Sequence, residues 1–162
     1  MANIREAKKG DLGGITEIYN DAIAKLTATF DTEPKTMAQQ ETWLAGHDAR
    51  HPVLVAEEDG SVVAWASLSP WSDRCAYSDT AEISLYVREE RRGKGIGKRL
   101  LAAMVRQGQS AGLHTILARI TGNNTSSAGF FESHGFLRVG TMKEVGRKFG
   151  MLLDVHLMQL IF

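Results

Sequence analysis

Hydrophobic residues recur along the chain at two spacings, and the spacing assigns each segment to a helix or a strand. From Asp11 the apolar positions come three and four residues apart as far as Leu26, which predicts an amphipathic helix with Asp11 as its N-cap. The same spacing begins at Ile96, and Gly112 is a suitable C-cap for that helix. The helices expected from this pattern cover residues 11–26, 36–49, 96–111 and 126–134.

Runs rich in β-branched and aromatic residues, several of them alternating with polar residues, predict the strands. Asp59-Gly60 separates two such runs and accepts the positive φ of a tight hairpin turn. Three strands follow one another without a helix between them, which indicates a mixed sheet with helices on its faces rather than an all-parallel sheet. The expected strands cover residues 4–7, 53–56, 62–68, 80–87, 115–120, 136–145 and 151–161.

Composition narrows the class of protein. The 162 residues suit one domain, 1–162, and 19 basic residues balance 19 acidic ones, which argues against a nucleic-acid partner. No apolar run approaches the roughly 18 residues of a membrane span, and the N-terminus has no signal-peptide pattern. One cysteine, Cys75, excludes an internal disulfide, and the histidines lack metal-ligand spacing, so we expect no metal. A cytoplasmic domain without a membrane partner is the simplest interpretation.

The most informative segment is the glycine-rich turn Gly93-Lys94-Gly95-Ile96-Gly97, which joins a strand to a helix. Without Cβ atoms, backbone can approach a ligand, and a helix N-terminus suits a pyrophosphate through its free N–H groups and dipole. The spacing fits neither a Walker loop nor the G-x-G-x-x-G fingerprint, because the glycines are two residues apart. A solvated basic turn with a helix cap is the competing interpretation.

The spacing Arg92-x-x-Gly95-x-Gly97 resembles the pyrophosphate loop of the GCN5-related N-acetyltransferase (GNAT) superfamily, and so does the stretch from Asn124 to Gly135-Phe136. The resemblance covers the whole chain. It implies an α+β fold with a mixed, mostly antiparallel sheet of about six to seven strands and about four flanking helices. Acetyl-CoA is then expected where the parallel strands at 80–87 and 115–120 splay apart.

By the same resemblance, the strand before the turn and the turn itself bind acetyl-CoA. Backbone N–H groups of the strand are the expected oxyanion and pantetheine donors. Asn124 is expected to hydrogen-bond the pantetheine or phosphate region, a role compatible with helix capping. The expected cofactor-binding residues are Leu85, Tyr86, Val87, Arg92, Gly93, Lys94, Gly95, Ile96, Gly97, Lys98 and Asn124.

Segments 29–34, 70–77, 80–82 and 146–150 are similar to the phosphinothricin N-acetyltransferase group, which includes methionine sulfone and methionine sulfoximine acetyltransferases. The resemblance implies direct acetyl transfer to the α-amine of a small amino-acid analogue. Glu82 is the candidate general base, because it lies three residues before Leu85 and an α-amine is largely protonated at neutral pH. An ordinary solvent-facing strand glutamate is the competing interpretation.

The loop from Ser69 to Asp79 is the expected wall of the substrate site. Arg74 could pair with a substrate carboxylate through both guanidinium nitrogens, unless it is simply a solvated loop arginine. The expected substrate-binding residues are Phe30, Ser72, Asp73, Arg74, Tyr77, Glu82, Ile83 and Ser84.

Phe131 departs from the superfamily pattern, where many members have a tyrosine that protonates the CoA sulfur. Phenylalanine has no proton to give, so the thiolate departs unaided or another group helps. His134 lies on nearly the same helix face, but capping of carbonyl groups at the helix end is the simpler role.

Two other functions stay open from the sequence. The chain could acetylate another amine, such as a protein N-terminus, a polyamine or an aminoglycoside, or it could be an acyl-CoA-binding sensor without turnover. The apolar residues of the last strand suit a homodimer interface, and core packing explains them equally well.

Overall fold

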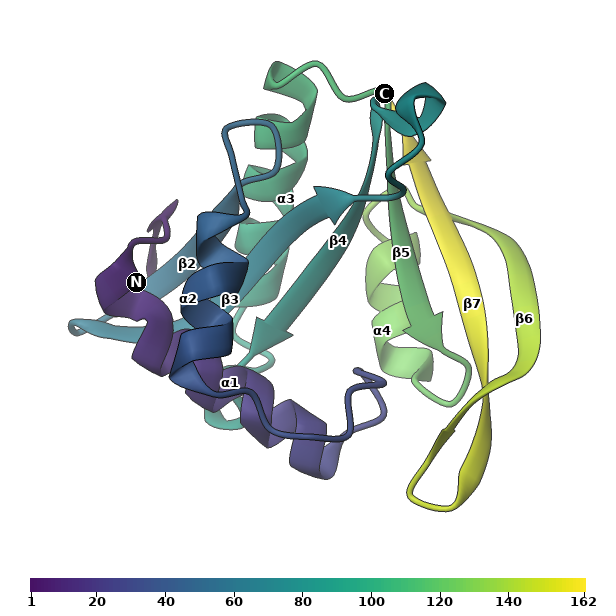
Figure 1. The fold of residues 1–162 in the computed structure, drawn as a ribbon, viewed down its shortest axis with the longest axis horizontal. Coiled ribbons are helices and arrows are strands. Elements are labelled where there is room, and N and C mark those ends of the chain that lie inside the picture. Colours follow the sequence, from purple (N-terminus) through teal and green to yellow (C-terminus); the bar gives the residue numbers. More distant parts are fainter.

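The computed structural model describes all 162 residues. Seven strands form one sheet in the order β1-β2-β3-β4-β5-β7-β6 (Figure 1). The strands are β1 (Asn3–Glu6), β2 (Val53–Glu58), β3 (Ser61–Pro70), β4 (Thr80–Val87), β5 (Thr115–Thr121), β6 (Leu137–Lys148) and β7 (Met151–Ile161). The α-helices are α1 (Leu12–Lys25), α2 (Met37–Ala45), α3 (Ile96–Ser110) and α4 (Thr125–Glu132).

Every pair of neighbouring strands is antiparallel except β4 and β5, which are parallel. Their register has only three pairs, Thr80 with Thr115, Ala81 with Ile116 and Glu82 with Leu117. Beyond Glu82 the two strands diverge, as Figure 1 shows between β4 and β5. The predicted mixed sheet with a splayed parallel pair and four helices is therefore confirmed.

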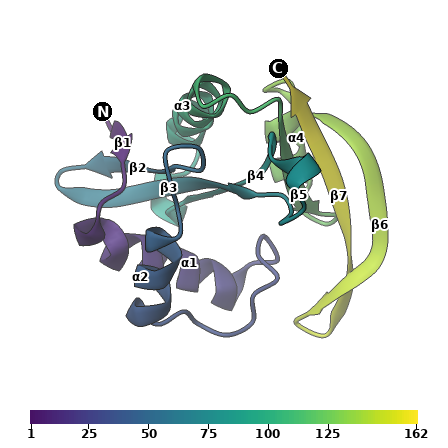
Figure 2. The same cartoon turned by 45° about the horizontal axis from the view of Figure 1, so that its top comes forward.

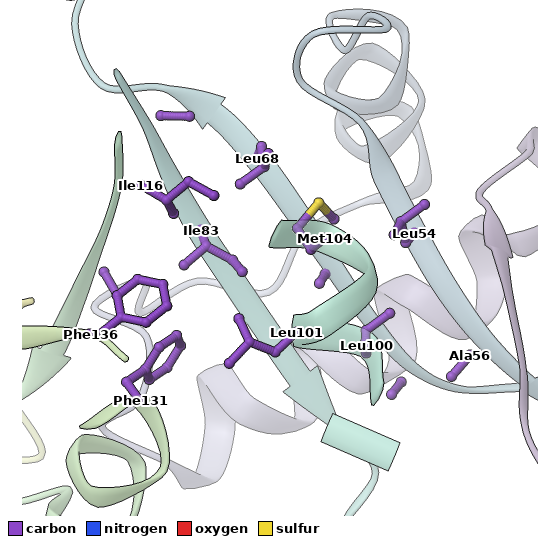
Figure 3. Close-up of a cluster of buried hydrophobic side chains, with 14 of the residues drawn as sticks. Leu54, Ala56, Leu68, Ile83, Leu100, Leu101, Met104, Ile116, Phe131 and Phe136 are labelled. Carbon is purple, nitrogen blue, oxygen red and sulfur yellow. The ribbon is translucent and has the colours of Figure 1, made fainter. Parts of the chain in front are cut away.

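Helices cover both faces of the sheet, with α1 and α2 on one side and α3 on the other (Figure 2). The larger apolar cluster, of 21 buried residues, lies under α3. Leu101 and Met104 of α3 point toward Leu68 and Ile83 of the sheet (Figure 3). A smaller cluster of six buried residues, including Ile15 and Trp65, packs α1 against the opposite face. β4 lies between the two clusters, because its Ile83 belongs to the larger one and its Tyr86 packs against the smaller one.

Local chemistry explains where the elements begin and end. Asp59 and Gly60 have φ values of 51° and 77°, as the predicted hairpin turn requires. Gly112, predicted as the C-cap of this helix, lies one residue beyond the C-cap Ala111, and its φ of 83° is the left-handed conformation that terminates many helices. Thr36 and Gln39 form a reciprocal capping box that starts α2.

Three sequence predictions need correction. Asp11 occupies the N-cap position of α1 as predicted, but its carboxylate accepts from Arg5 and from the Lys8 N–H at 2.8 Å and makes no hydrogen bond to the helix amides. The second helix ends at Ala45 rather than at residue 49, because the chain turns at Gly46. The strand expected at 136–145 continues to Lys148, and two register shifts let it curve along β7.

β6 is an edge strand of 12 residues, and most of its side chains are exposed. None of the helices combines the length and the hydropathy needed to cross a bilayer.

Candidate active site

Two adjoining cavities open where β4 and β5 diverge. One has a volume of about 570 Å³ and contains Glu82, and the other has about 770 Å³ and contains the glycine turn. Leu85 and Tyr86 of β4 line both cavities, so this strand forms the boundary between them. We call the first the acceptor cavity and the second the cofactor cavity.

The backbone of the glycine turn leaves the cofactor cavity open. Gly93 and Gly95 have φ values of 73° and 78°, and a Cβ at either position would meet no atom within 4 Å. Gly95 is the N-cap of α3, so the free N–H groups of the first helical turn follow it directly. An open cradle of backbone donors with Arg91, Arg92 and Lys98 around it fits the pyrophosphate of CoA.

Ten of the eleven predicted cofactor-binding residues line this cavity. They are Leu85, Tyr86, Val87, Arg92, Gly93, Gly95, Ile96, Gly97, Lys98 and Asn124. Lys94 does not line it, because its side chain turns back and its Nζ donates to the Glu90 carbonyl at 3.1 Å. Asn124 caps α4, with its Oδ1 accepting from the Ser127 N–H at 3.1 Å, so capping and ligand contact are compatible there.

Glu82 lies in the acceptor cavity and is held by Arg119 of β5. Arg119 donates from Nη2 to Glu82 Oε1 at 2.7 Å and from Nε to Oε2, a two-point contact. The Glu82 side chain is 19% exposed and that of Arg119 is 55% exposed. The hydrogen bonds to Glu82 raise the pKa of Arg119, which stays charged in any case.

The sequence reasoning missed Arg119. It is the only charged residue in the apolar strand Thr115–Thr121, and that feature was the available signal. Because residue pairs in the short parallel register share a face, Arg119 follows Leu117 on the face that also presents Glu82. Only the pairing of two strands distant in sequence brings this cation to the candidate base.

The loop from 26 to 31 forms a second wall that the sequence did not indicate, apart from Phe30. Tyr19 donates to Asp31 and lies 3.0 Å from the Thr29 hydroxyl, and all three residues line the acceptor cavity. Burial raises the pKa of Tyr19, and it raises the pKa of Tyr86 to about 12. Both phenols therefore stay protonated at neutral pH and offer hydrogen-bond donors rather than bases.

The predicted substrate residues separate into two groups. Phe30, Glu82, Ile83 and Ser84 line the acceptor cavity. The second group lies outside its lining, on the loop after β3, and consists of Ser72, Asp73, Arg74 and Tyr77. This loop approaches the site at Trp71, whose ring centre lies 5.7 Å from the Arg119 guanidinium carbon.

Phe131 is 5% exposed and packs edge-on against Phe136 at 5.0 Å, with its ring in the core (Figure 3). His134 Nδ1 lies 2.6 Å from the Phe130 carbonyl, so this nitrogen carries the proton and caps the end of α4, as predicted. The structure holds no group of three or more His, Cys, Asp or Glu side chains arranged to bind a metal ion.

The sequence matches the acetyltransferase (GNAT) family over residues 15–136. An L-methionine sulfoximine/L-methionine sulfone acetyltransferase from Pseudomonas paraeruginosa is 40% identical over 164 residues, covering 98% of this chain and 94% of that one. A phosphinothricin acetyltransferase from Sinorhizobium meliloti, solved in complex with acetyl-CoA, has a TM-score of 0.93 and 34% identity, with 99% and 88% of the two chains covered.

A ribosomal-protein-alanine N-acetyltransferase from Brucella melitensis has a TM-score of 0.96 and 36% identity, with 99% of each chain covered. The backbone alone therefore does not separate enzymes named for amino-acid analogues from one named for a protein substrate. The family match extends from α1 to the end of α4, and these relatives align with nearly the whole chain. The chain therefore belongs to the GNAT family of acetyltransferases.

Proposed function

We propose that this acetyltransferase moves the acetyl group of acetyl-CoA to the α-amino group of a small amino-acid analogue, of the type of methionine sulfone, methionine sulfoximine or phosphinothricin. One observation carries the proposal: a carboxylate on β4, Glu82, lies in a cavity that shares Leu85 and Tyr86 with the cofactor cavity. The names of the Pseudomonas and Sinorhizobium relatives support this substrate class.

In the proposed reaction, Glu82 takes the proton that the substrate ammonium must lose, directly or through a water molecule. Acetyl-CoA, when bound, supplies a thioester carbonyl for the neutral amine to attack. Backbone N–H groups of β4 between Leu85 and Val87 donate to the carbonyl oxygen as its negative charge develops. Phe131 gives no proton, and a thiol with a pKa of roughly 8.5 leaves as a thiolate that solvent protonates.

The test is release of free CoA thiol from acetyl-CoA in the presence of separate amines. The panel contains methionine sulfone, methionine sulfoximine, phosphinothricin, spermidine, an aminoglycoside and a peptide with an N-terminal alanine. We expect the highest kcat/KM with one of the three amino-acid analogues, and mass spectrometry should find one acetyl group on its nitrogen. Preference for the peptide would move the chain to the activity of the Brucella relative, and binding of acetyl-CoA without turnover of any amine would favour a sensor.

We also propose that the 162 residues act as one catalytic domain and that two copies associate as a homodimer. The support is the long edge strand β6, because an uncovered edge of this length invites pairing. Exposed apolar side chains on β6 and β7 include Leu137, Val139, Met151 and Leu152. A cytoplasmic location, where acetyl-CoA is made and used, and the lack of nucleic-acid and membrane partners remain predictions of the same kind.

A further inference from the structure

The acceptor cavity is lined by three charged side chains, of which one is cationic. Among the 19 residues that line it, Asp31 and Glu82 are acidic, and Arg119 is the only cation. Lys148 lies close by but does not line the cavity, and its Nζ is occupied by the Leu26 and Thr29 carbonyls at 2.6 and 2.8 Å. A negatively charged group that enters this cavity therefore has one cationic partner, Arg119.

Arg119 has donors to spare. A guanidinium carries five N–H bonds, and two of them are used by Glu82, which leaves three. The Arg119 side chain is 55% exposed and that of Glu82 is 19% exposed, so Arg119 is the more accessible partner of the pair. The Trp71 ring near the guanidinium limits the directions from which a ligand reaches this group.

An α-amino acid carries an ammonium and a carboxylate on the same carbon atom. Glu82 and Arg119 present the complementary charges side by side, with the carboxylate and the guanidinium in direct contact. We propose that Arg119 binds the α-carboxylate of the substrate while Glu82 receives the proton of its amine, so that the two side chains recognise a zwitterion as one unit. This inference rests on the proposed function and deepens it by assigning the carboxylate.

The assignment differs from the one that the sequence suggested, in which Arg74 reads the carboxylate. Arg74 lies on the loop after β3, outside the residues that line the acceptor cavity, whereas Arg119 touches the candidate base. A carboxylate bound by Arg119 places the adjacent amine next to Glu82, because one carbon atom joins the two groups.

The test compares methionine sulfone with 3-(methylsulfonyl)propylamine, which is the same molecule without the carboxylate. For Arg119→Gln we expect KM for methionine sulfone to rise about tenfold to a hundredfold, the effect of losing a hydrogen bond to a charged group. The kcat/KM for the decarboxylated amine should fall less than that for methionine sulfone, because this amine loses only the contact between Arg119 and Glu82. The KM for acetyl-CoA should stay near its wild-type value. Arg119→Lys keeps the charge but loses the forked guanidinium. Its KM for methionine sulfone should therefore lie between that of the wild type and that of Arg119→Gln.

Arg138→Gln is the matched control, because Arg138 also pairs with a glutamate, Glu132 at 3.4 Å, but on the surface. Equal losses for both substrates in Arg119→Gln would show that Arg119 only positions Glu82, and no loss for either would remove it from the site. Loss of carboxylate discrimination in Arg74→Gln instead would return the assignment to Arg74. Each of these results overturns the proposal.

If thermal melting shows that Arg119→Gln does not fold, the test uses Arg119→Lys instead. An intermediate KM of this variant for methionine sulfone supports the proposal, and a wild-type KM overturns it. A wild-type protein that turns over neither compound would reject the proposed function, which is a separate result.

Discussion

Glu82 meets two requirements of a general base that are difficult to combine on a strand. It must be anionic before the substrate arrives, and it must point at one place. The contact with Arg119 bears on both, because the guanidinium fork pairs its positive charge with the carboxylate and fixes the plane of that group. The cost is competition, since a carboxylate that accepts two strong hydrogen bonds has fewer lone pairs for a proton.

Replacing Glu82 with Gln keeps the size of the side chain but removes its basicity. We expect kcat to fall by about 10²–10⁴, the usual contribution of a positioned base, with acetyl-CoA affinity unchanged because Glu82 lies outside the cofactor cavity. The loss should shrink at alkaline pH, where solvent supplies the neutral amine. Glu132→Gln, on the surface of α4, is the control. A pH–rate profile of Glu82→Gln with the level and shape of wild type would reject the role.

At the scale of elements, the junction from β4 to α3 does most to shape the cofactor cavity. Gly95 is the N-cap of α3 and Gly112 follows its C-cap, Ala111. Both glycines have positive φ with open space where a Cβ would stand. Only Gly95 lies in the cofactor cavity. The two ends of α3 therefore separate the effect of backbone strain from the effect of lost ligand approach.

Gly95→Val and Gly112→Val should both destabilise the fold, by about 1–2 kcal/mol or more, because an L residue is strained in the left-handed region. Gly95→Val alone should weaken acetyl-CoA binding, since its side chain occupies the space that a pyrophosphate needs. Calorimetric titration with acetyl-CoA measures the binding, and thermal melts measure the stability. Unchanged acetyl-CoA affinity in Gly95→Val would contradict the assignment of the turn.

The same elements show what a sequence can predict here. The turn at Asp59-Gly60, the end of a helix near Gly112 and the order of helices and strands depend on neighbours along the chain, and each is confirmed. The contact between Arg119 and Glu82 was not predicted, because it depends on the pairing of two strands more than thirty residues apart in sequence. Arg74 attracted attention because it is close to Glu82 in sequence, but the loop after β3 carries it outside the cavity lining.

Across the whole molecule, the sheet has two halves, β1 to β4 and β5 to β7, which pair directly only over the three-residue register of β4 and β5. The loop from 26 to 31 supplies further contacts to the second half. Its backbone accepts hydrogen bonds from Thr121 at the end of β5 and from Lys148 at the end of β6. The Phe30 ring lies so close to Gly146 of β6 that a Cβ there would come within 2.2 Å of it. Thr29 and Phe30 of this loop also line the acceptor cavity, so the loop that joins the two halves of the sheet forms one of its walls.

Among the side chains in these contacts, Lys148 has the largest desolvation cost, because it carries an ammonium and is only 4% exposed. Burial lowers the pKa of its ammonium below the ordinary value of 10.5. The unfolded chain therefore holds this proton more tightly than the folded chain does. The pH-dependent part of the Lys148 contribution to stability is full above pH 10.5 and is lost as the pH falls through the lowered folded pKa. The hydrogen bonds to the two carbonyls are present on both sides of this range.

We expect Lys148→Met to lower the free energy of unfolding by about 1–3 kcal/mol, since two buried carbonyls lose their donor. The gap between wild type and variant should widen as the pH rises from the lowered folded pKa toward 10.5, because only wild type gains stability there. Lys143→Met, on the same strand, is the matched control. Asp154 raises the pKa of Lys143, so its contribution declines as the pH rises and its gap should change with the opposite sign. Urea unfolding at several pH values measures both gaps, and KM for the amine reports whether the loop still closes the acceptor cavity. If the two gaps changed with pH in the same direction, the pKa of Lys148 would not be lowered by burial, and this prediction would be wrong.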